Sequence, residues 1–338
     1  MPNILDVARR AGVAPITVSR VINNSGYFSE EIRQRVESAI KELGYVPNTL
    51  ARSLRSKKTN TLALVLTDIT NPFFTVVARG VEDTASDAGF MVIYCNTDES
   101  EIEEEKYVQM LLQKQVDGIL LVPARSEPTN IANIKAKGTP VVVIDRRIEG
   151  IEADVVRCDS EGGAYQLTQL LLDMGHRHIA VLSGPQHIST AADRVAGYRR
   201  AMTEAGMSSN ECIYFGNYHQ KSGYEMARQA LAVTPRPTAF FTANNFIAVG
   251  ALNALQEAGL CVPEDFSLVT FDDLPPTLTT YHFLTAIAQP AYEMGKKAME
   301  LLLARLNPEN VLPYQEVVLP TELVIRQSSG RAPGKISL

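Results

Sequence analysis

From Thr61 onward, short apolar runs alternate with longer amphipathic stretches, and this alternation constrains the fold more than any other feature of the chain. Short apolar runs bounded by turn residues predict buried strands, and apolar residues spaced three or four positions apart predict helices. Strands and helices that alternate in this way form doubly wound parallel sheets. The predicted strands are Leu62–Leu66, Met91–Tyr94, Gly118–Val122, Val141–Ile144, Ile179–Leu182, Ala239–Phe241 and Ser267–Phe271, and the predicted helices include Ala78–Ala88, Glu103–Gln115, Ala164–Met174 and Met294–Leu306.

Length and composition extend this prediction to an α/β protein with more than one domain. The chain has 338 residues, of which 45% are hydrophobic and 21% charged, and it is too long for one ordinary core. Its four cysteines lie far apart, so neither a disulfide scaffold nor a zinc site is expected. No apolar stretch approaches the ~18 residues of a membrane-spanning helix, and the N-terminus has no signal-peptide pattern. We therefore expect a cytoplasmic protein that does not contact a membrane.

The charge of the chain is distributed unevenly. Residues 1–60 contain ten Lys or Arg and five Asp or Glu, a net charge of +5, whereas the whole chain carries −6. The other 278 residues therefore carry −11. A small basic segment on an acidic body is typical of proteins that bind nucleic acid through the basic segment. A solvated charged surface would give the same balance, so the pattern within the segment must decide.

That pattern predicts a helix-turn-helix unit. Asn3 caps a helix over Ile4–Ala11, Gly12 ends it, and Pro15 suits the first turn of a second helix. Ser29 caps a third helix that ends near Leu43, before Gly44. In such a unit the second helix lies in the major groove of DNA. The residues predicted to contact DNA from this helix are Pro15, Ile16, Thr17, Ser19, Arg20 and Asn23.

The segment after Pro47 has the composition of a short helix that needs a partner. Asn48–Ser56 is too short to be stable alone, and Lys57–Asn60 has the composition of a linker. An apolar side chain between arginines suits insertion into the minor groove, so Leu54 is the predicted wedge. The predicted DNA contacts of this segment are Ala51, Arg52, Leu54 and Arg55.

The motifs of this region resemble one family of DNA-binding proteins. Ile4-Leu5-Asp6-Val7-Ala8, Ala11-Gly12-Val13, Thr17-Val18-Ser19-Arg20-Val21-Ile22-Asn23 and Tyr45-Val46-Pro47-Asn48 occur in the order found in the lactose/purine repressor (LacI) family of bacterial transcription regulators, and the match continues to the end of the chain. The resemblance implies a body like a periplasmic binding protein, with two similar subdomains, three crossovers and a cleft between them. It implies a DNA-binding domain at 1–47, a hinge at 48–60, a first subdomain at 61–159 and 291–319, a second at 160–290 and 320–327, and a tail at 328–338.

No motif of catalysis accompanies these elements. The chain has no G-x-x-x-x-G-K-[ST], H-E-x-x-H or G-x-S-x-G motif, and no G-x-G-x-x-G follows a predicted strand. His176 and His178 have no third metal ligand nearby in the sequence. Asp272 and Asp273 follow a predicted strand, which is a position for ligand contact. We therefore expect no enzymatic activity, no metal and no cofactor.

Polar and aromatic residues recur just after the predicted strands, where open α/β sheets bind ligands. Asn71, Phe73 and Phe74 follow the first strand, and two aromatic faces beside an amide suit a sugar, although both rings could instead pack the next helix. Asp145 and Arg146 follow the fourth strand and suit charge-assisted bonds to hydroxyl groups, although they could form an exposed ion pair. Taken separately, Arg194, Asn244, Asp272 and Gln289 are unremarkable.

Together these residues are similar to the sugar-contact set of ribose-type binding proteins and related repressors. The resemblance implies an effector site of Asn71, Phe73, Phe74, Asp145, Arg146, Arg194, Asn244, Asp272 and Gln289, with Tyr218 as an aromatic stacker. One residue departs from the family pattern, because Asn245 stands where many members have Asp. A second arginine, Arg147, could favour an acidic sugar or a phosphate.

The sequence therefore predicts a homodimeric repressor of carbohydrate genes that binds a palindromic double-stranded operator and is switched by a small sugar-like effector. The main alternative is a catabolite-control-type regulator whose effector is a partner protein, a phosphorylated sugar or a sugar acid. A transporter solute-binding protein is disfavoured by the basic N-terminal segment, and a sugar enzyme by the missing catalytic residues. The residues after Ile325 contain no heptad of leucines, so a dimer without a tetramer-forming coiled coil is expected.

Overall fold

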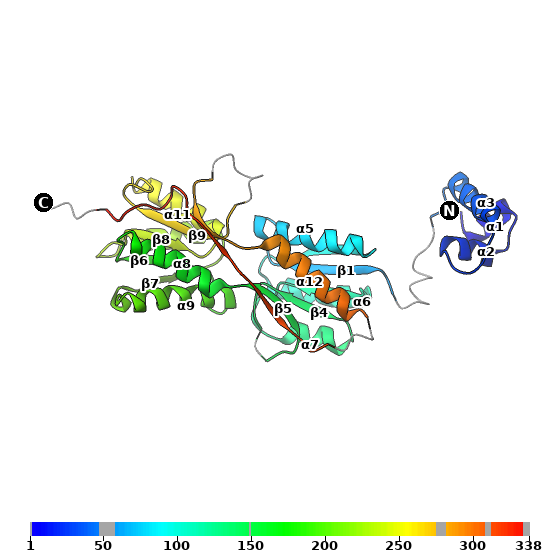
Figure 1. Ribbon diagram of the computed structural model, residues 1–338, viewed down its shortest axis with the longest axis horizontal. Helices are drawn as coiled ribbons and strands as arrows, with labels where there is room; N and C mark the ends of the chain where they lie inside the picture. Colours follow the sequence, from blue (N-terminus) through cyan, green and yellow to red (C-terminus); the bar gives the residue numbers. More distant parts are fainter. Residues whose placement is uncertain (1, 47–57, 149, 275–281, 308–311, 334–338) are drawn as a thin grey trace. The chain divides into compact units, whose positions relative to one another are not determined.

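The computed structural model describes residues 2–46, 58–148, 150–274, 282–307 and 312–333 (Figure 1). The chain divides into two compact units, Met1–Thr59 and Asn60–Leu338. The predicted hinge helix at 48–56, with Ala51, Arg52, Leu54 and Arg55, lies outside the described residues.

The first unit, the head, contains the three predicted helices. They are α1 (Ile4–Ala11), α2 (Pro15–Ile22) and α3 (Glu30–Leu43). Local capping sets their ends. The Asn3 side chain accepts hydrogen bonds from the first turn of α1, the Ser29 hydroxyl accepts one from the Ile32 amide, and Gly44 ends α3 in a left-handed conformation. Val7, Val18 and Val36, one from each helix, are fully buried in the shared core.

The turn between α1 and α2 is held from α3. Gly12 adopts φ +64°, which suits glycine, and a side chain there would meet the Arg35 guanidinium. Arg35 Nη2 donates to the backbone carbonyls of Ala11 and Gly12 at 2.5 and 3.2 Å. The third helix therefore fixes the angle at which α2 leaves α1, as a helix-turn-helix unit requires.

The second unit, the body, contains two six-stranded sheets. Their orders are β11-β5-β4-β3-β1-β2 and β12-β10-β9-β8-β6-β7, and every described pairing is parallel except that of β10 with β12. The predicted fold class is confirmed. The strands are β1 (Thr61–Leu66), β2 (Met91–Asn96), β3 (Gly118–Leu121), β4 (Val141–Ile144), β5 (Asp154–Cys158), β6 (Ile179–Ser183), β7 (Cys212–Phe215), β8 (Ala239–Thr242), β9 (Ser267–Phe271), β10 (Thr285–Ala288), β11 (Glu316–Leu319) and β12 (Glu322–Val324).

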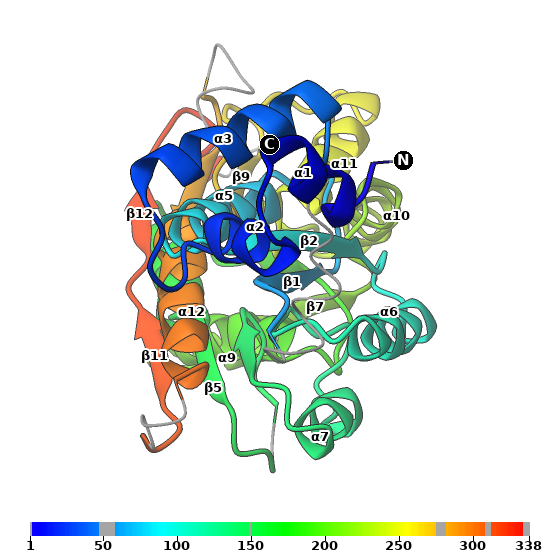
Figure 2. The same ribbon diagram turned by 90° about the vertical axis from the view of Figure 1, so that its right-hand side faces the viewer.

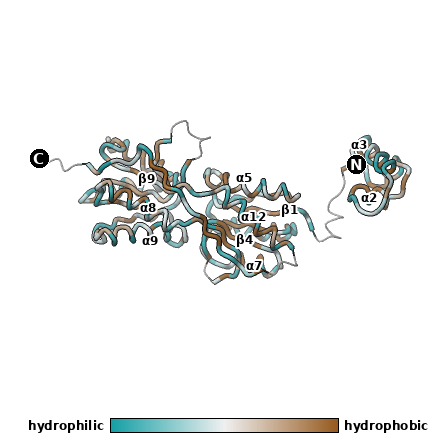
Figure 3. The backbone as a smooth tube through the Cα atoms, viewed as in Figure 1, coloured by the Kyte–Doolittle hydropathy of each residue, from teal (hydrophilic) through white to brown (hydrophobic). Residues whose placement is uncertain are grey.

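Helices cover both faces of each sheet, because the buried strands are apolar on both sides. In the first lobe, the sheet that contains β1 with its helices, α5 and α12 pack on one face and α6 and α7 on the other (Figure 2). In the second lobe, α8 and α9 face α10 and α11 across the sheet. Hydrophobic residues concentrate along the strands (Figure 3). The helices are α5 (Pro72–Asp87), α6 (Glu101–Gln113), α7 (Thr129–Ala136), α8 (Ser160–Asp173), α9 (Ser189–Glu204), α10 (Gln220–Leu231), α11 (Asn245–Glu257) and α12 (Ala291–Arg305), with a 3₁₀ turn at Ser208–Asn210.

The chain passes between the two sheets at three described places, after β5, β10 and β11. The last two crossovers involve short strands that the sequence did not predict, and β5 and β7 were also missed. Helix α5 begins at Pro72, six residues before the predicted start at Ala78, because Asn71 caps it and Pro72 occupies its first position. Phe73 and Phe74 therefore lie in the first turn of a helix and not in a loop.

The stretch assigned to a tail begins inside the second lobe. Ser328 is fully buried, and its hydroxyl bonds the Leu268 carbonyl and the Thr285 amide. His176, also fully buried, contacts Thr238, Ser267 and the Gly330 carbonyl, so it is a packed core histidine. Within the described ranges there is no cluster of metal-ligating side chains, and no helix there has the length and apolar character to cross a membrane.

Candidate functional site

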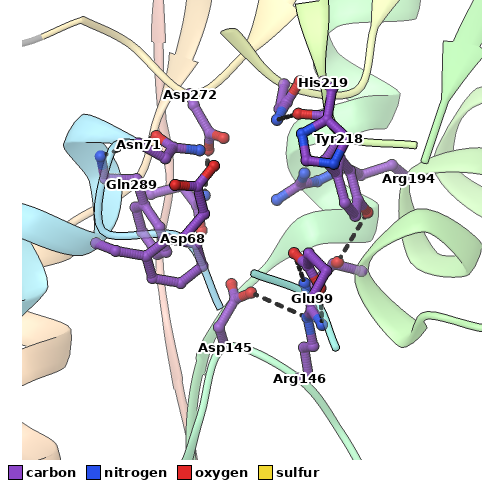
Figure 4. Close-up of a pocket in the computed structure, with 14 residues that line it drawn as sticks. Asp68, Asn71, Glu99, Asp145, Arg146, Arg194, Tyr218, His219, Asp272 and Gln289 are labelled. Carbon is purple, nitrogen blue, oxygen red and sulfur yellow. Dashed lines mark hydrogen bonds and ion pairs between the residues drawn. The ribbon is translucent and has the colours of Figure 1, made fainter. Parts of the chain in front are cut away.

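A pocket lies between the two lobes at the carboxyl ends of their strands. Side chains from both lobes converge on it (Figure 4). The lining residues are Asp68, Asn71, Phe73, Phe74, Glu99, Asp145, Arg146, Thr190, Arg194, Tyr218, His219, Asn244, Asp272 and Gln289.

All ten residues predicted for the effector site line this one pocket. Strands in parallel sheets end at a common edge, so residues that follow different strands meet there. Four lining residues were not predicted: Asp68 after β1, Glu99 after β2, Thr190 on α9 and His219 before α10. The same rule would have found Asp68 and Glu99, since each follows a predicted strand by only a few residues.

The Arg146 guanidinium is the most constrained group in the pocket. Its Nη1 and Nη2 donate to the two carboxylate oxygens of Glu99 at 2.8 and 2.6 Å, and Nη1 also reaches the carbonyls of Pro123 and Ala124. The side chain is only 2% exposed. Burial lowers the pKa of Arg146, but the charge and hydrogen bonds of Glu99 outweigh it and leave that pKa raised. Arg146 is therefore a fixed, neutralised cation in the wall of the pocket.

Asp145 and Asp272 occupy equivalent places in the two lobes. Each follows a buried strand, β4 or β9, and each adopts a left-handed backbone, with φ 70° and 69°. Aspartate is one of the few residue types that enter this region, and such conformations concentrate at functional sites. Burial raises the pKa of Asp145 to about 6, although Arg194 and Arg146 oppose the shift. Burial also raises the pKa of Asp272, against the charge of Arg194 and a hydrogen bond from Gln289.

The second lobe contributes a guanidinium that lies against an aromatic ring. The Arg194 guanidinium carbon is 3.9 Å from the centre of the Phe271 ring, and Nη1 donates to the Ala243 carbonyl at 2.6 Å. Burial lowers the pKa of Arg194, but Asp272 and other nearby groups outweigh it and leave that pKa raised. The Tyr218 hydroxyl bonds Thr190 at 3.1 Å. These contacts fix the ring and the guanidinium that face the first lobe.

Two amides link the lobes beside the pocket. Asn71 Oδ1 accepts hydrogen bonds from the Phe73 amide and from Asn245 Nδ2, each at 3.1 Å. Asn245, the residue that departs from the family pattern, does not line the pocket, and its contact with the pocket is the hydrogen bond to the lining residue Asn71. Phe73 and Phe74 pack edge to face with ring centroids 5.0 Å apart, and they serve both the core and the pocket wall.

Three buried polar atoms of lining residues have no hydrogen-bond partner among the described residues. They are Asp145 Oδ1, Arg146 Nε and Arg194 Nε. Such atoms are rare in folded proteins, because leaving a buried polar atom unpaired costs about 1–3 kcal/mol. The residues that line the pocket therefore carry one acceptor and two donors that no described protein group satisfies.

Arg147 does not join this set, which corrects the prediction that it could select an anionic ligand. Its guanidinium pairs with Asp193 on α9, and it is not a lining residue. The two adjacent guanidiniums therefore pair with carboxylates of different lobes, Arg146 with Glu99 and Arg147 with Asp193. Asp273 is likewise directed away, to Arg326 at 2.6 Å.

On the head, the predicted DNA contacts of α2 lie at the surface to different degrees. Pro15, Ile16 and Arg20 are exposed, with Ile16 57% exposed, and Thr17 and Ser19 are half-buried. Asn23 ends α2, and its amide bonds the Ser19 carbonyl at 2.7 Å, so this side chain points back along the helix. Tyr27, which sequence reasoning missed, is 94% exposed.

The comparisons with known proteins agree with this arrangement. Residues 3–48 match the family of bacterial regulatory proteins called the lacI family, and residues 168–329 match the periplasmic binding protein-like domain. The chain is 36% identical to the purine repressor PurR of Photobacterium profundum, over 97% of this chain and 98% of that protein. It is also 36% identical to the ribose operon repressor of Escherichia coli K12, over 97% of this chain and 100% of that protein.

A solved structure extends the match to the whole architecture. The lac repressor dimer bound to its operator and an anti-inducer superposes with a TM-score of 0.85 and 26% identity, over 97% of this chain and 99% of that one. A head with capped helix-turn-helix geometry, a two-lobed body and relatives that match along nearly their full length lead to one conclusion: the chain belongs to the lacI family of bacterial transcriptional regulators.

Proposed function

We propose that this protein is a sequence-specific DNA-binding repressor of carbohydrate genes, switched by a small neutral sugar in the pocket between the lobes. It acts in the cytoplasm as a homodimer on a palindromic operator, and no catalytic step is assigned to it. The observation that carries the proposal is the trio of unpaired buried atoms, Asp145 Oδ1, Arg146 Nε and Arg194 Nε, beside the paired rings of Phe73 and Phe74.

A sugar fits this combination because it presents both hydroxyl groups and apolar C–H faces. Its hydroxyls can donate to Asp145 and accept from the two guanidinium Nε groups, while one face lies against an aromatic ring. Asn71 Nδ2 adds a donor, since Asn71 Oδ1 is held by the Phe73 amide. A purine repressor and a ribose operon repressor are equally identical to this chain, so sequence identity does not distinguish the ligand classes. We therefore infer the ligand class from the chemistry of the pocket.

The charges of the pocket favour a neutral ligand. Four carboxylates line it, from Asp68, Glu99, Asp145 and Asp272, against the guanidiniums of Arg146 and Arg194. Glu99 already neutralises Arg146 through two hydrogen bonds. A phosphate or sugar acid would meet four carboxylates, with Arg194 as the one lining guanidinium that no described carboxylate pairs, and Arg147 pairs with Asp193. A phosphorylated sugar or sugar acid is therefore disfavoured as the effector.

The switch follows from the placement of the contacts. Lining residues come from both lobes, so a bound sugar stabilises the closed arrangement, by no more than its affinity difference between open and closed states. The body begins at Thr61, the first residue of β1 in the first lobe, and the linker to the head precedes it. In a dimer, the angle between the two lobes of each subunit would set the distance between the Thr61 residues of the two subunits. We propose that the sugar releases DNA by changing this separation.

The experiment is a gel-shift titration of an operator fragment with the full chain, alone and with a panel of pentoses, hexoses, sugar acids and sugar phosphates. The proposal expects a neutral sugar to shift the titration and sugar acids and phosphates to have no effect. If only a phosphorylated ligand or only a partner protein changed DNA binding, the proposed neutral-sugar effector would be wrong. If the protein bound all DNA sequences equally well, its proposed role as a sequence-specific regulator would be wrong.

Arg20 should carry sequence readout from α2. It is exposed near the end of that helix, and an arginine–guanine contact contributes about 1–3 kcal/mol of discrimination. We expect Arg20→Ala to weaken operator binding roughly 5- to 150-fold while random DNA loses much less. Competition binding at fixed salt measures the ratio, and Arg9→Ala on α1 is the matched control for lost charge. Equal losses on both DNAs would show that Arg20 contacts only phosphates.

The exposed face of β2 should form part of the dimer interface. This strand lies at the edge of the first sheet, and Met91 and Ile93, which share one face of it, are 68% and 38% exposed. Exposed apolar residues on an edge strand require cover. The double substitution Met91→Lys with Ile93→Lys should raise the dimer dissociation constant by about tenfold or more, because two ammonium groups would be desolvated. Sedimentation velocity measures it, with Ile102→Lys on α6 as the control, and an unchanged dimer would place the interface elsewhere.

A further inference from the structure

The two lobes also meet outside the effector pocket, through four side chains beside the start of α9. The Arg147 amide donates to Ser189 Oγ at 2.8 Å, and the Ser189 amide donates to Ser126 Oγ at 3.1 Å. The Arg147 guanidinium pairs with the Asp193 carboxylate. Ser126 and Arg147 belong to the first lobe, and Ser189 and Asp193 to α9 of the second. We call these four residues the closure contact.

Helix α9 depends on this contact for its own first turn. Ile188 occupies the capping position of α9 and supplies no side-chain hydrogen bond. The Ser126 hydroxyl takes that role from the other lobe, because it accepts the hydrogen bond of the first α9 amide. The Ser189 amide, the first of α9, therefore has this hydrogen bond only when the lobes are together.

The loop that carries Ser126 is held rigidly from behind. Arg146 Nη1 donates to the carbonyls of Pro123 and Ala124, and the buried Glu104 accepts a hydrogen bond from the Ala124 amide at 2.5 Å. Arg125 pairs with Glu101 at the start of α6. These bonds fix the backbone on both sides of Ala124, so the loop presents Ser126 from a preorganised position.

The first two turns of α9 also supply two residues of the pocket. Thr190 follows Ser189 directly and bonds the Tyr218 hydroxyl, and Arg194 follows Asp193 directly and carries one of the unpaired Nε atoms. Each residue of the closure contact on α9 is thus the neighbour of a residue that lines the pocket. A shift of the N-terminal end of α9 would move Thr190 and Arg194 together.

We propose that Ser126 and Arg147 are positioning residues of the effector site, which act through α9 on Thr190 and Arg194 without touching the effector. The proposal rests on the proposed function and adds to it a source of affinity outside the pocket. Contacts made only in the closed state raise the fraction of closed protein, and apparent effector affinity rises by the same factor while the open state dominates. Effector affinity therefore depends on Ser126 and Arg147 as well as on the pocket.

The expected effects are moderate and separable. Loss of a helix cap corresponds to about fivefold in an equilibrium constant, and loss of a part-exposed ion pair to about two- to fivefold. We expect Ser126→Ala and Arg147→Ala each to weaken binding of the sugar found in the panel by about three- to tenfold, mainly through faster dissociation. The swapped pair Arg147→Asp with Asp193→Arg should recover most of the loss caused by Arg147→Ala.

Calorimetry and stopped-flow dissociation on the full chain test these values. Arg199→Ala is the matched control, because Arg199 lies on the same helix but pairs with Glu211 inside the second lobe. Unfolding midpoints of the sugar-free variants separate folding from closure: a merely structural role lowers the midpoint and leaves the dissociation constant of the folded protein unchanged. Unchanged dissociation constants in both alanine variants would overturn the proposal.

A second measurement keeps the proposal testable even if no sugar binds, which would refute the proposed function. Amide exchange at Ser189 and Thr190 should be faster in Ser126→Ala than in the wild type, because the Ser189 amide loses its hydrogen-bond partner across the lobes. Equal exchange in both proteins would show that Ser126 does not cap α9, whatever the pocket binds.

Discussion

Glu99→Ala is expected to lower the free energy of unfolding by about 3 kcal/mol, because it leaves the Arg146 guanidinium buried without its carboxylate. Arg146 is 2% exposed, and Glu99 supplies two of its hydrogen bonds. The carbonyls of Pro123 and Ala124 and the nearby Asp145 would remain, so the loss should fall at the low end of the range for a broken buried pair.

Urea denaturation followed by circular dichroism measures this loss. The control is Glu103→Ala on α6, whose exposed pair with Lys106 should contribute less than about 1 kcal/mol. Glu99→Ala combined with Arg146→Met should recover part of the stability, since the uncompensated charge is then gone. A single variant as stable as the wild type would mean that the guanidinium finds other partners without cost.

Asp145→Asn is expected to have the opposite effect on stability and to abolish the response to the sugar. The pKa of Asp145 is raised to about 6 in the folded protein from 3.8, which corresponds to about 3 kcal/mol of destabilisation at pH 7. Asparagine also tolerates the left-handed backbone at this position, so the substitution adds no strain. It removes the charged acceptor that a sugar hydroxyl would use, however, and we expect effector affinity to fall at least about 100-fold.

The pH dependence supplies the check on the cause. In the wild type the unfolded chain loses the Asp145 proton near pH 3.8 and the folded chain near pH 6, so this residue reduces stability progressively as pH rises between those values. The stability gained by Asp145→Asn should therefore be large at pH 7 and small near pH 4. Sugar binding to the wild type should weaken as pH falls below about 6, because the ligand hydroxyl prefers the ionised carboxylate. A stability gain that does not vary with pH would contradict burial of the charge as its cause.

The two substitutions separate what the pocket needs for folding from what it needs for binding. Glu99 stabilises the fold by neutralising a buried cation, whereas Asp145 is held ionised at a cost that a ligand can offset. Sites that bind polar ligands commonly keep such unfavourable groups, and their replacement stabilises the protein while it removes function.

The elements that could be predicted from the sequence are those set by local signals. Asn3, Gly12, Ser29 and Gly44 mark the ends of α1 and α3 to the residue, because capping involves only groups within a few positions of each other. The buried strands β1, β3, β4, β6, β8 and β9 could be predicted in the same way, since each lies in a mostly apolar run. Cleft residues such as Asn71, Asp145 and Asp272 could be predicted because they follow predicted parallel strands, which end at one edge. Arg194 on α9, and Tyr218 and Gln289 after strands that were not predicted, followed only from the family resemblance.

The tertiary structure decided the features that depend on distant partners. Strands β11 and β12 are short and only partly buried, and they exist because β5 and β10 offer free edges to pair with. Nothing near Arg146 or Arg147 in the sequence indicates that one pairs with Glu99 and the other with Asp193, 47 and 46 residues away. One guanidinium therefore became part of the pocket wall and its neighbour a contact between the lobes. Their roles differ because the carboxylates that surround them belong to different lobes, and the packing of the whole fold, not residue type, decides which distant groups surround a side chain.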